Sequence, residues 1–303
     1  MSSDLTNFKS VNKMLGELKL LTRSKNTELT YLKSLKNFFN HIGVSDPDML
    51  IEKIKNKEID ANEIYKQYVV SLASRNIAPK SVAAWAAGVK KFFLANGIEV
   101  KPIPIKVYPL HEDTLPTKED LKKVLETSSL KARLCILILL SSGLRVGELH
   151  QLKIGDIELD KDPPVIRVKG ISAKERKSRI TFISPQAKEV LKEYLEKRKL
   201  NENITSDSPL LVTDDGKPMS YQNLQYILNN AFKKVAKRVG KRYSLHPHSL
   251  RKWFKTQLIS AGTPGPIVDR LVGHSRYLAS EYELYTEEQL RQWYLKSMDA
   301  LMI

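Results

Sequence analysis

The sequence has a single cysteine, Cys135, among 303 residues. One thiol cannot form an internal disulfide, so the chain is not a disulfide-stapled scaffold. The 6 histidines are scattered along the chain, and with one cysteine they do not form a zinc-type cluster. Because Cys135 lies inside the apolar run LCILILL, we expect an inert thiol in the hydrophobic core.

The sequence also lacks a long hydrophobic run. The longest, LCILILL (134–140), has the length of a buried helix segment, well short of the roughly 18 apolar residues that a membrane span requires. The N-terminal MSSDLTNFKS does not have the basic and then apolar pattern of a signal peptide. These absences predict a soluble, intracellular, cytoplasmic protein with no membrane partner.

Acidic residues are few relative to basic ones. Asp and Glu total 34 against 50 Lys and Arg, which gives a net charge of +16. Such an excess favours a polyanionic partner, either nucleic acid or an anionic membrane surface. A well-solvated, lysine-rich surface explains the same composition, so charge alone leaves both interpretations open.

The chain divides into two segments around a proline-rich connector, and its length is that of about two domains. KPIPIKVYPLHEDTLP (101–116) holds four prolines, a density that excludes helix and favours an extended linker. We expect a helical domain at 1–100 and a second domain at 117–303. In the first, helices at 27–43 and 80–97 predict a small bundle with a basic face. The residues that carry this prediction are Leu29, Leu32, Leu35, Phe38, Phe39 and Ile42, with Gly43 as a stop, then Ser81 as an N-cap, Val82, Trp85, Val89, Phe92 and Phe93, and the lysines Lys33, Lys36, Lys90 and Lys91.

The second segment reads as mixed, mainly helical with a small β-sheet (α+β). Thr117 and Asp120 have the spacing of a capping box, and a buried helix at 130–143 ends at Gly143. The β-rich runs PVIRVKG and RITFIS flank a polar stretch, which predicts a hairpin with a charged tip. Further helices are expected at 184–200, with Pro185 in the first turn, at 220–240, and in the terminal segment after Thr286.

Several motifs along the second segment carry chemistry. In LHPHSLRKWFK, His248 and Arg251 are three residues apart and project from one helix face. An imidazole beside a cation suits a phosphate or carboxylate, although this pair alone occurs by chance in many chains. Arg145 follows a Gly-Leu turn in SSGLRVGELHQL, and His274 lies in the turn LVGHS. Tyr282 and Tyr285 follow within a dozen residues of His274.

Taken in order, these motifs resemble the tyrosine recombinase family of the phage-integrase type. The shared series is Gly-Leu-Arg-x-x-Glu-Leu, a lysine-bearing hairpin, Pro-His-x-Leu-Arg, a Gly-His-Ser turn and a late tyrosine. The resemblance covers about residues 117–295, and the helical first segment more weakly resembles the family's core-binding domain. The ending YELYTEEQLRQWYLKSM is most similar to the integrases of archaeal viruses and plasmids.

The resemblance implies catalytic roles for six positions and a supporting one for Glu148. Arg145 and Arg251 match the two catalytic arginines, His248 the histidine of the His-x-x-Arg box, and His274 the later His/Trp position. Arg145 also lies at i to i+3 reach of Glu148, so a purely structural ion pair is the competing interpretation. His150 and His246 match no catalytic position.

The lysine and the nucleophile each have alternatives. The hairpin offers Lys169, Lys174 and Lys177, and the family spacing before Phe182 favours Lys174. Tyr277, Tyr282 and Tyr285 lie three, eight and eleven residues past His274, and the family spacing is about nine. We therefore expect Tyr282 as the nucleophile, with Tyr285 as the alternative and Tyr277 as a packing residue.

The chemistry that the resemblance implies is phosphoryl transfer on DNA through a 3′-phosphotyrosine. Lys174 would act as general acid, His248 would take the tyrosine proton, and His274 would hydrogen-bond the phosphate. Bond energy is conserved and two guanidiniums clamp the phosphate, so the expectation is no cofactor, no metal and no ATP.

The leading hypothesis is an integrase/excisionase of a mobile element that acts on attachment-type sites in double-stranded DNA as a homotetramer. The rival hypotheses are a host chromosome-dimer resolvase, a type IB topoisomerase-like enzyme, a catalytically dead DNA-binding protein, and a binder of membrane surfaces or acidic proteins. The terminal EEQLRQWYLKSMDALMI has an apolar side that either packs on its own domain or is exchanged with a neighbour.

Overall fold

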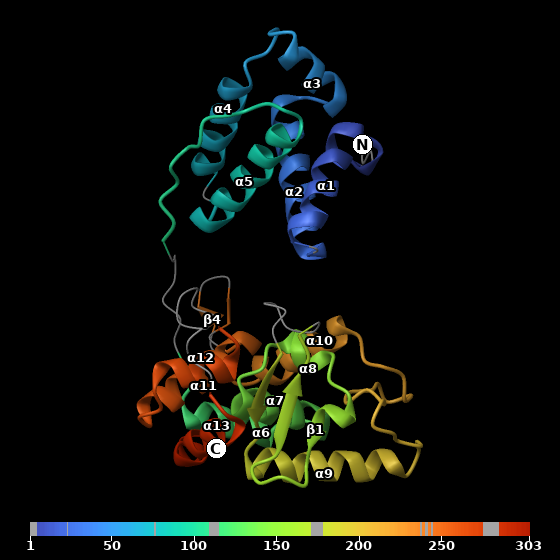
Figure 1. Cartoon of the computed structure of the whole chain (residues 1–303), viewed down its shortest axis with the longest axis vertical. Helices are drawn as coiled ribbons and strands as arrows, with labels where there is room; N and C mark the ends of the chain where they lie inside the picture. Colours follow the sequence, from blue (N-terminus) through green and yellow to red (C-terminus); the bar gives the residue numbers. More distant parts are fainter. Residues whose placement is uncertain are drawn as a thin grey trace. The chain divides into compact units, whose positions relative to one another are not determined.

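The computed structural model describes residues 5–22, 24–75, 77–108, 115–170, 178–236, 238–239, 242–243, 245–274 and 285–303, with backbone alone at 238–239 and 242–243. The chain forms two compact units, Met1–Glu112 and Asp113–Ile303, which are described separately below. The described residues are mainly helical with a small three-stranded sheet, which confirms the predicted α+β fold (Figure 1).

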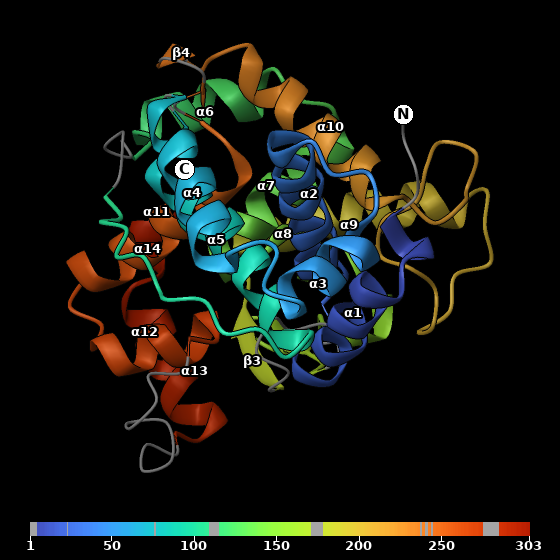
Figure 2. The same cartoon turned by 90° about the horizontal axis from the view of Figure 1, so that it is seen from above.

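The first unit is a helical bundle around an aromatic core. Helices α2 and α5 cross closely because Gly88 has no side chain, and a Cβ there would collide with the Ser34 hydroxyl. The rings of Phe38, Phe92 and Phe93 are fully buried and meet in tilted and edge-on pairs, an arrangement that aromatic quadrupoles favour. The helices, seen in Figure 1 and Figure 2, are α1 (Lys9–Leu21), α2 (Lys25–Ile42), α3 (Pro47–Lys55), α4 (Ala61–Ser74) and α5 (Pro79–Ala95), preceded by the 3₁₀ turn η1 (Leu5–Asn7).

Three details of the first unit differ from the sequence prediction. Helix α5 begins at Pro79 with Ala78 as N-cap, because proline at the first helical position needs no N–H partner, so Ser81 is not the cap. Leu29 is 55% exposed instead of buried. Lys91 does not belong to an exposed basic face, since its ammonium is 2.6 Å from the Glu17 carboxylate and its side chain is mostly covered.

The second unit is built around helix α7 (Leu130–Ser142). This helix is hydrophobic on every side and buried over nearly its whole length, as expected of a central core helix. It packs against α6 (Lys118–Glu126), α9 (Pro185–Lys199) and the sheet (Figure 1). Cys135 is fully buried here, and burial raises the pKa of its thiol to about 12, which confirms an inert core thiol.

The predicted hairpin is confirmed, and its tip at 171–177 lies outside the described residues. Strands β2 (Val165–Val168) and β3 (Arg179–Phe182) pair antiparallel, with Val168 opposite Arg179. A third strand, β1 (Ile157–Glu158), adds to the edge of β2 and was not predicted, because two residues carry no periodicity.

The helix expected at 220–240 is shorter than predicted. Helix α10 (Tyr221–Lys233) ends at Lys233, and further along the chain β4 (Arg238–Val239) pairs antiparallel with β5 (Arg242–Tyr243). Valine and tyrosine favour strands and glycine disfavours helix, so VGKRY carried a signal against helix. The second unit also contains α8 (Val146–His150), η2 (Ile154–Asp156), α11 (Pro247–Ser260) and α12 (Gly265–Val272).

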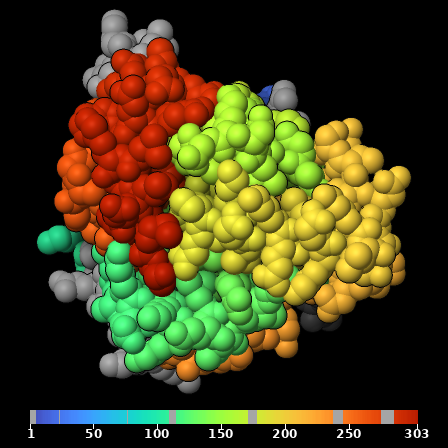
Figure 3. Space-filling view, turned by 90° about the horizontal axis from the view of Figure 1, so that it is seen from below, coloured from blue at the N-terminus to red at the C-terminus, as the bar shows by residue number. Residues whose placement is uncertain are grey.

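The terminal segment packs on its own unit. Helix α13 (Glu287–Lys296) has the predicted N-cap Thr286, which shares a capping box with Gln289. Tyr294 is fully buried and donates a 2.8 Å hydrogen bond to the Ser141 carbonyl, and α14 (Met298–Leu301) follows. Figure 3 shows this segment, in red, lying against the green residues near 120 and the yellow residues near 190. Within the described ranges, no helix is long and apolar enough to cross a membrane.

Candidate active site

Arg145 stands at the start of α8, directly after the turn that ends α7. Gly143 adopts the left-handed conformation with φ of 62° and stops α7, so the chain turns and Arg145 becomes the N-cap of α8. Its Nη1 donates to Glu148 Oε1 at 2.9 Å and its backbone N–H donates to Oε2 at 2.8 Å. The i to i+3 ion pair considered from the sequence is therefore present, and 23% of the Arg145 side chain stays exposed.

Glu148 is shared with a second arginine that the sequence did not single out. Arg179, at the start of β3, donates from Nη1 to Oε1 at 3.1 Å and from Nη2 to Oε2 at 2.7 Å. Burial on its own raises the pKa of Glu148, but the hydrogen bonds and charges of Arg179 and then Arg145 lower it below the ordinary 4.5. Glu148 is consequently a carboxylate at neutral pH, and each of its oxygens accepts two hydrogen bonds.

Arg251 lies on α11 and is almost completely buried. Its Nη2 donates to the Val272 carbonyl at 2.6 Å, and its Nη1 donates to the Gly143 carbonyl. The first carbonyl precedes the turn to His274 and the second precedes the turn to Arg145. Arg251, with 3% of its surface exposed, thus ties together the two turns that carry the other predicted site residues.

His274 follows the left-handed Gly273 at the end of α12. Its Nδ1 lies 3.3 Å from Lys255 Nζ and 3.7 Å from Asp269 Oδ1. Burial lowers the pKa of His274 below the ordinary 6.5, and the charges of Arg251, Lys255 and Arg145 lower it further against the opposing effect of Asp269. The imidazole is therefore neutral near pH 7. Because an ammonium only donates, Nδ1 accepts and the proton resides on Nε2.

Replacing Lys255 with methionine should raise the pKa of His274. The substitution removes a nearby cation and leaves Asp269 to act on the imidazole without the ion pair at 2.8 Å that now engages it, and both changes favour the protonated form. Protonation should then occur at higher pH than in the wild type, as followed by an NMR titration of the imidazole C–H resonances. Lys192→Met, on an exposed ion pair of α9, should leave that titration unchanged. An unchanged or lowered His274 pKa in Lys255→Met would contradict the assignment.

His248 lies in the first turn of α11, three residues before Arg251, and its side chain is exposed. Its ring stacks on that of His246, with centroids 6.4 Å apart and planes at 6°. His246 itself caps α11 through Nδ1, which accepts from the Ser249 N–H at 3.2 Å. His150 hydrogen-bonds the Met219 carbonyl at 2.9 Å.

Two predicted site residues, Lys174 and Tyr282, lie outside the described residues, as do Lys177 and Tyr277. Of the alternatives, Lys169 is described and pairs with Asp156 at 2.7 Å. Tyr285 is partly buried and packs against the core of the second unit, directly before the cap of α13. The structure thus describes Arg145, Arg251 and His274 as one cluster, with His248 one turn away from Arg251.

This cluster presents positive charge and hydrogen-bond donors held by a rigid frame. Arg145 and His274 are partly exposed beside the buried Arg251, and the charges of both arginines act on the imidazole. Such a set is suited to a phosphate, because guanidiniums bind its oxygens as planar forks. Across the described ranges, no group of three or more His, Cys, Asp or Glu side chains is placed to hold a metal ion.

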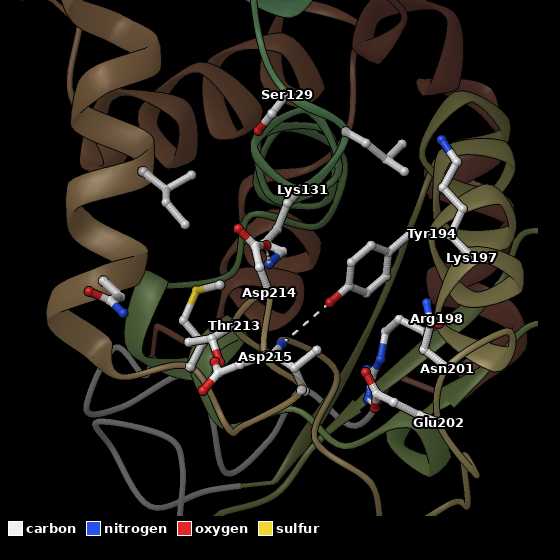
Figure 4. Close-up of a pocket in the computed structure, with 16 residues that line it drawn as sticks. Ser129, Lys131, Tyr194, Lys197, Arg198, Asn201, Glu202, Thr213, Asp214 and Asp215 are labelled. Carbon is white, nitrogen blue, oxygen red and sulfur yellow. Dashed lines mark hydrogen bonds and ion pairs between the residues drawn. The ribbon is translucent and has the colours of Figure 1, made fainter.

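A pocket of about 860 Å³ lies elsewhere in the second unit, between α7, α9 and the loop before α10 (Figure 4). Several charged side chains that line it form salt bridges with one another, Lys131 with Asp214 at 2.7 Å and Arg198 with Glu202 at 2.8 Å. The Tyr194 hydroxyl accepts from the Val212 N–H, the dashed line in Figure 4. The described site residues Arg145, His248, Arg251 and His274 do not line this pocket.

Comparisons with known proteins agree with this chemistry. The sequence model described as the Phage integrase family matches residues 116–289. The chain is 30% identical over 294 residues to "Tyrosine recombinase XerC" of Staphylococcus saprophyticus subsp. saprophyticus, which covers 89% of this chain and 95% of that protein.

Solved structures share the fold at low sequence identity. The Tn1549 transposon integrase in complex with a circular intermediate DNA aligns with a TM-score of 0.66 at 17% identity, over 94% of this chain and 98% of that one. A lambda integrase tetramer bound to a Holliday junction aligns with a TM-score of 0.63 at 16% identity, over 91% of this chain and 79% of that one.

Proposed function

Because the chain belongs to the phage integrase family of tyrosine recombinases, enzymes that cleave and rejoin DNA, we propose that it is a site-specific recombinase with Tyr282 as nucleophile. The observation that carries the proposal is the cluster of Arg145, Arg251 and His274, in which Arg251 hydrogen-bonds the two turns that carry Arg145 and His274. We propose residues 117–303 as the catalytic domain, 1–100 as the core-binding domain that helps to grip DNA, and 101–116 as the linker.

In the proposed reaction, Tyr282 Oη attacks the scissile phosphorus and the bond from phosphorus to the 5′-oxygen breaks. His248 takes the tyrosine proton, and Lys174 gives a proton to the departing 5′-oxygen. The products are a 3′-phosphotyrosine and a 5′-hydroxyl. The 5′-hydroxyl of a second strand then attacks the phosphotyrosine and gives its proton to Lys174, while His248 returns a proton to the departing Tyr282 Oη, and a new phosphodiester forms. One phosphoester replaces another at each step, so no external energy source is required.

The arginines would act on the charge that develops on the non-bridging oxygens in the transition state. Arg251 is desolvated and its neighbours are fixed carbonyls, so its position requires little reorganisation during reaction. The neutral His274 would donate from Nε2 to the same phosphate, which follows from the accepting role of Nδ1 toward Lys255.

We propose two more specific functions as alternatives. Chromosome-dimer resolution in a host is supported by the relatives named XerC, which match this chain over most of its length. Integration and excision of a mobile element at attachment-type sites is supported by the ending YELYTEEQLRQWY, which resembles the integrases of archaeal viruses and plasmids. In both, double-stranded DNA is the partner.

Covalent capture on DNA tests whether the protein is a recombinase and distinguishes the resolvase from the integrase. The wild-type protein is incubated with fragmented DNA of its source organism carrying random nicks, which trap the adduct because the cleaved fragment diffuses away. Sequencing of the DNA bound to protein should return one or a few sites. A resolvase should recombine two copies of the same site, whereas an integrase should join two different sites and leave hybrid junctions. Adducts scattered over all sequences would favour a topoisomerase-like enzyme, and a folded protein with no adduct would contradict the proposal.

We further propose that the protein recombines DNA as a homotetramer and exchanges its terminal segment between neighbours. The apolar residues Leu290, Tyr294 and Leu301 cover the unit's own core in the single chain. The same contacts, made by a neighbour's segment, would link protomers without new chemistry, as in domain swapping.

A further inference from the structure

Arg179 is a buried arginine, and its described partners are groups that support other site residues. Its side chain is 3% exposed, and each of its three guanidinium nitrogens has a partner. Nη1 and Nη2 bind the two oxygens of Glu148, and Nε donates to the Leu271 carbonyl at 3.0 Å. With all three nitrogens engaged in this way, Arg179 is placed to hold its neighbours in position.

Toward α8, Arg179 controls the carboxylate that orients Arg145. Glu148 Oε1 accepts from Nη1 of both arginines, at 2.9 Å from Arg145 and 3.1 Å from Arg179. Without Arg179, Glu148 and Arg145 would form a neutral pair, and the carboxylate would hold the Arg145 guanidinium more strongly. With it, the three side chains carry a net charge of +1, so positive charge remains available for a phosphate.

Toward α12, Arg179 packs beneath the turn that carries His274. Its Nε fixes the Leu271 carbonyl, three residues before the histidine. Gly273 is in the left-handed conformation with φ of 72°, and a Cβ there would lie 2.8 Å from Arg179 Cδ. The turn therefore lies directly against the Arg179 side chain, and any residue larger than glycine at position 273 would be strained.

We propose that Arg179 is a positioning residue for the phosphate clamp, the name used here for Arg145, Arg251 and His274. It fixes Glu148 on one side and the Gly273-His274 turn on the other. This inference rests on the proposed function, since it concerns the clamp of that reaction. A lysine could not replace it, because one ammonium cannot span both Glu148 oxygens and the Leu271 carbonyl as the planar guanidinium does.

The test compares cleavage of a normal phosphodiester with cleavage of a methylphosphonate, in which a methyl group replaces one charged non-bridging oxygen. The substrate is the site recovered by covalent capture. For Arg179→Gln we expect cleavage of the phosphodiester to fall about 10²- to 10³-fold, the size seen when one oxyanion donor is lost. On the uncharged methylphosphonate the deficit should shrink to about tenfold or less, because the missing clamp then has less charge to stabilise. Arg179→Lys should resemble Arg179→Gln.

Arg198→Gln is the matched control, since Arg198 is also a buried arginine that binds a carboxylate and two carbonyls, but on α9 and in the separate pocket. It should lower the melting temperature without changing the ratio of the two cleavage rates. If Arg179→Gln fails to fold, the double variant Glu148→Gln/Arg179→Gln removes both buried charges and keeps the comparison possible.

Two results would overturn the inference: equal loss on both substrates by a folded Arg179 variant, or wild-type cleavage of the phosphodiester by that variant. Failure of the proposed function looks different, because the wild-type protein itself would then form no adduct on either substrate.

Discussion

A Tyr282→Phe protein is expected to form no covalent adduct with DNA, while a Tyr285→Phe protein should form it at near wild-type rate. Phenylalanine keeps the ring but has no oxygen to attack phosphorus, so the strand-cleavage rate should fall by at least about 10⁴-fold, as when other covalent catalysts lose their nucleophile. The adduct is measured by its reduced mobility in denaturing gels on a nicked substrate.

The structure supports Tyr285 as the control in this comparison. Tyr285 packs partly buried on the core of the second unit, directly before Thr286, whose hydroxyl caps α13. Phenylalanine keeps the packed ring, so Tyr285→Phe should leave cleavage intact. Tyr277→Phe serves as a second control. An adduct with Tyr282→Phe and none with Tyr285→Phe would reverse the assignment.

Local rules account for the parts of the fold that the sequence predicted. Thr117 and Thr286 cap helices through side-chain oxygens, and Gly43 and Gly143 end helices in the left-handed conformation. Each signal acts within one helical turn, and each leaves a mark in adjacent residues. The hairpin of β2 and β3 was predicted for the same reason, because two β-rich runs flank one polar stretch.

The features that escaped prediction depend on contacts between distant residues. Lys91 has the sequence pattern of a surface lysine, but it forms an ion pair with Glu17 on another helix. Strand β1 is too short to show alternation and exists only because β2 offers an edge.

The same distinction between local signals and distant contacts applies to the candidate site. Arg145, Arg251 and His274 belong to short ordered motifs and could be named from the sequence. Arg179 could not, because its partners Glu148 and Leu271 are 31 and 92 residues away. Lys255 likewise acquires a role only through the turn that brings His274 to it. The motifs therefore name the groups proposed to bind the phosphate, together with Glu148, whereas Arg179 and Lys255 can be identified only from the packing.

Conversion of either clamp arginine to lysine should lower cleavage strongly while leaving DNA binding almost unchanged. Arg145→Lys and Arg251→Lys keep the positive charge but lose the planar fork that binds two phosphate oxygens at once. We expect the single-turnover cleavage rate to fall about 10²- to 10³-fold, as with loss of one preorganised donor. Affinity, measured by gel shift at fixed salt, should change less than about threefold, because one contact among many charge contacts is kept.

The two variants should differ in stability, which separates catalytic from structural loss. Arg251 is 3% exposed and donates to two carbonyls, so a lysine there leaves a buried acceptor unsatisfied at a cost of about 1–3 kcal/mol. Arg145 is partly exposed and retains Glu148 as a partner, so Arg145→Lys should unfold near the wild-type temperature. Arg167→Lys, on the exposed ion pairs of β2, is the control and should cleave normally. A normal cleavage rate in the stable Arg145→Lys protein would remove Arg145 from the clamp, because in that variant misfolding could not account for the result.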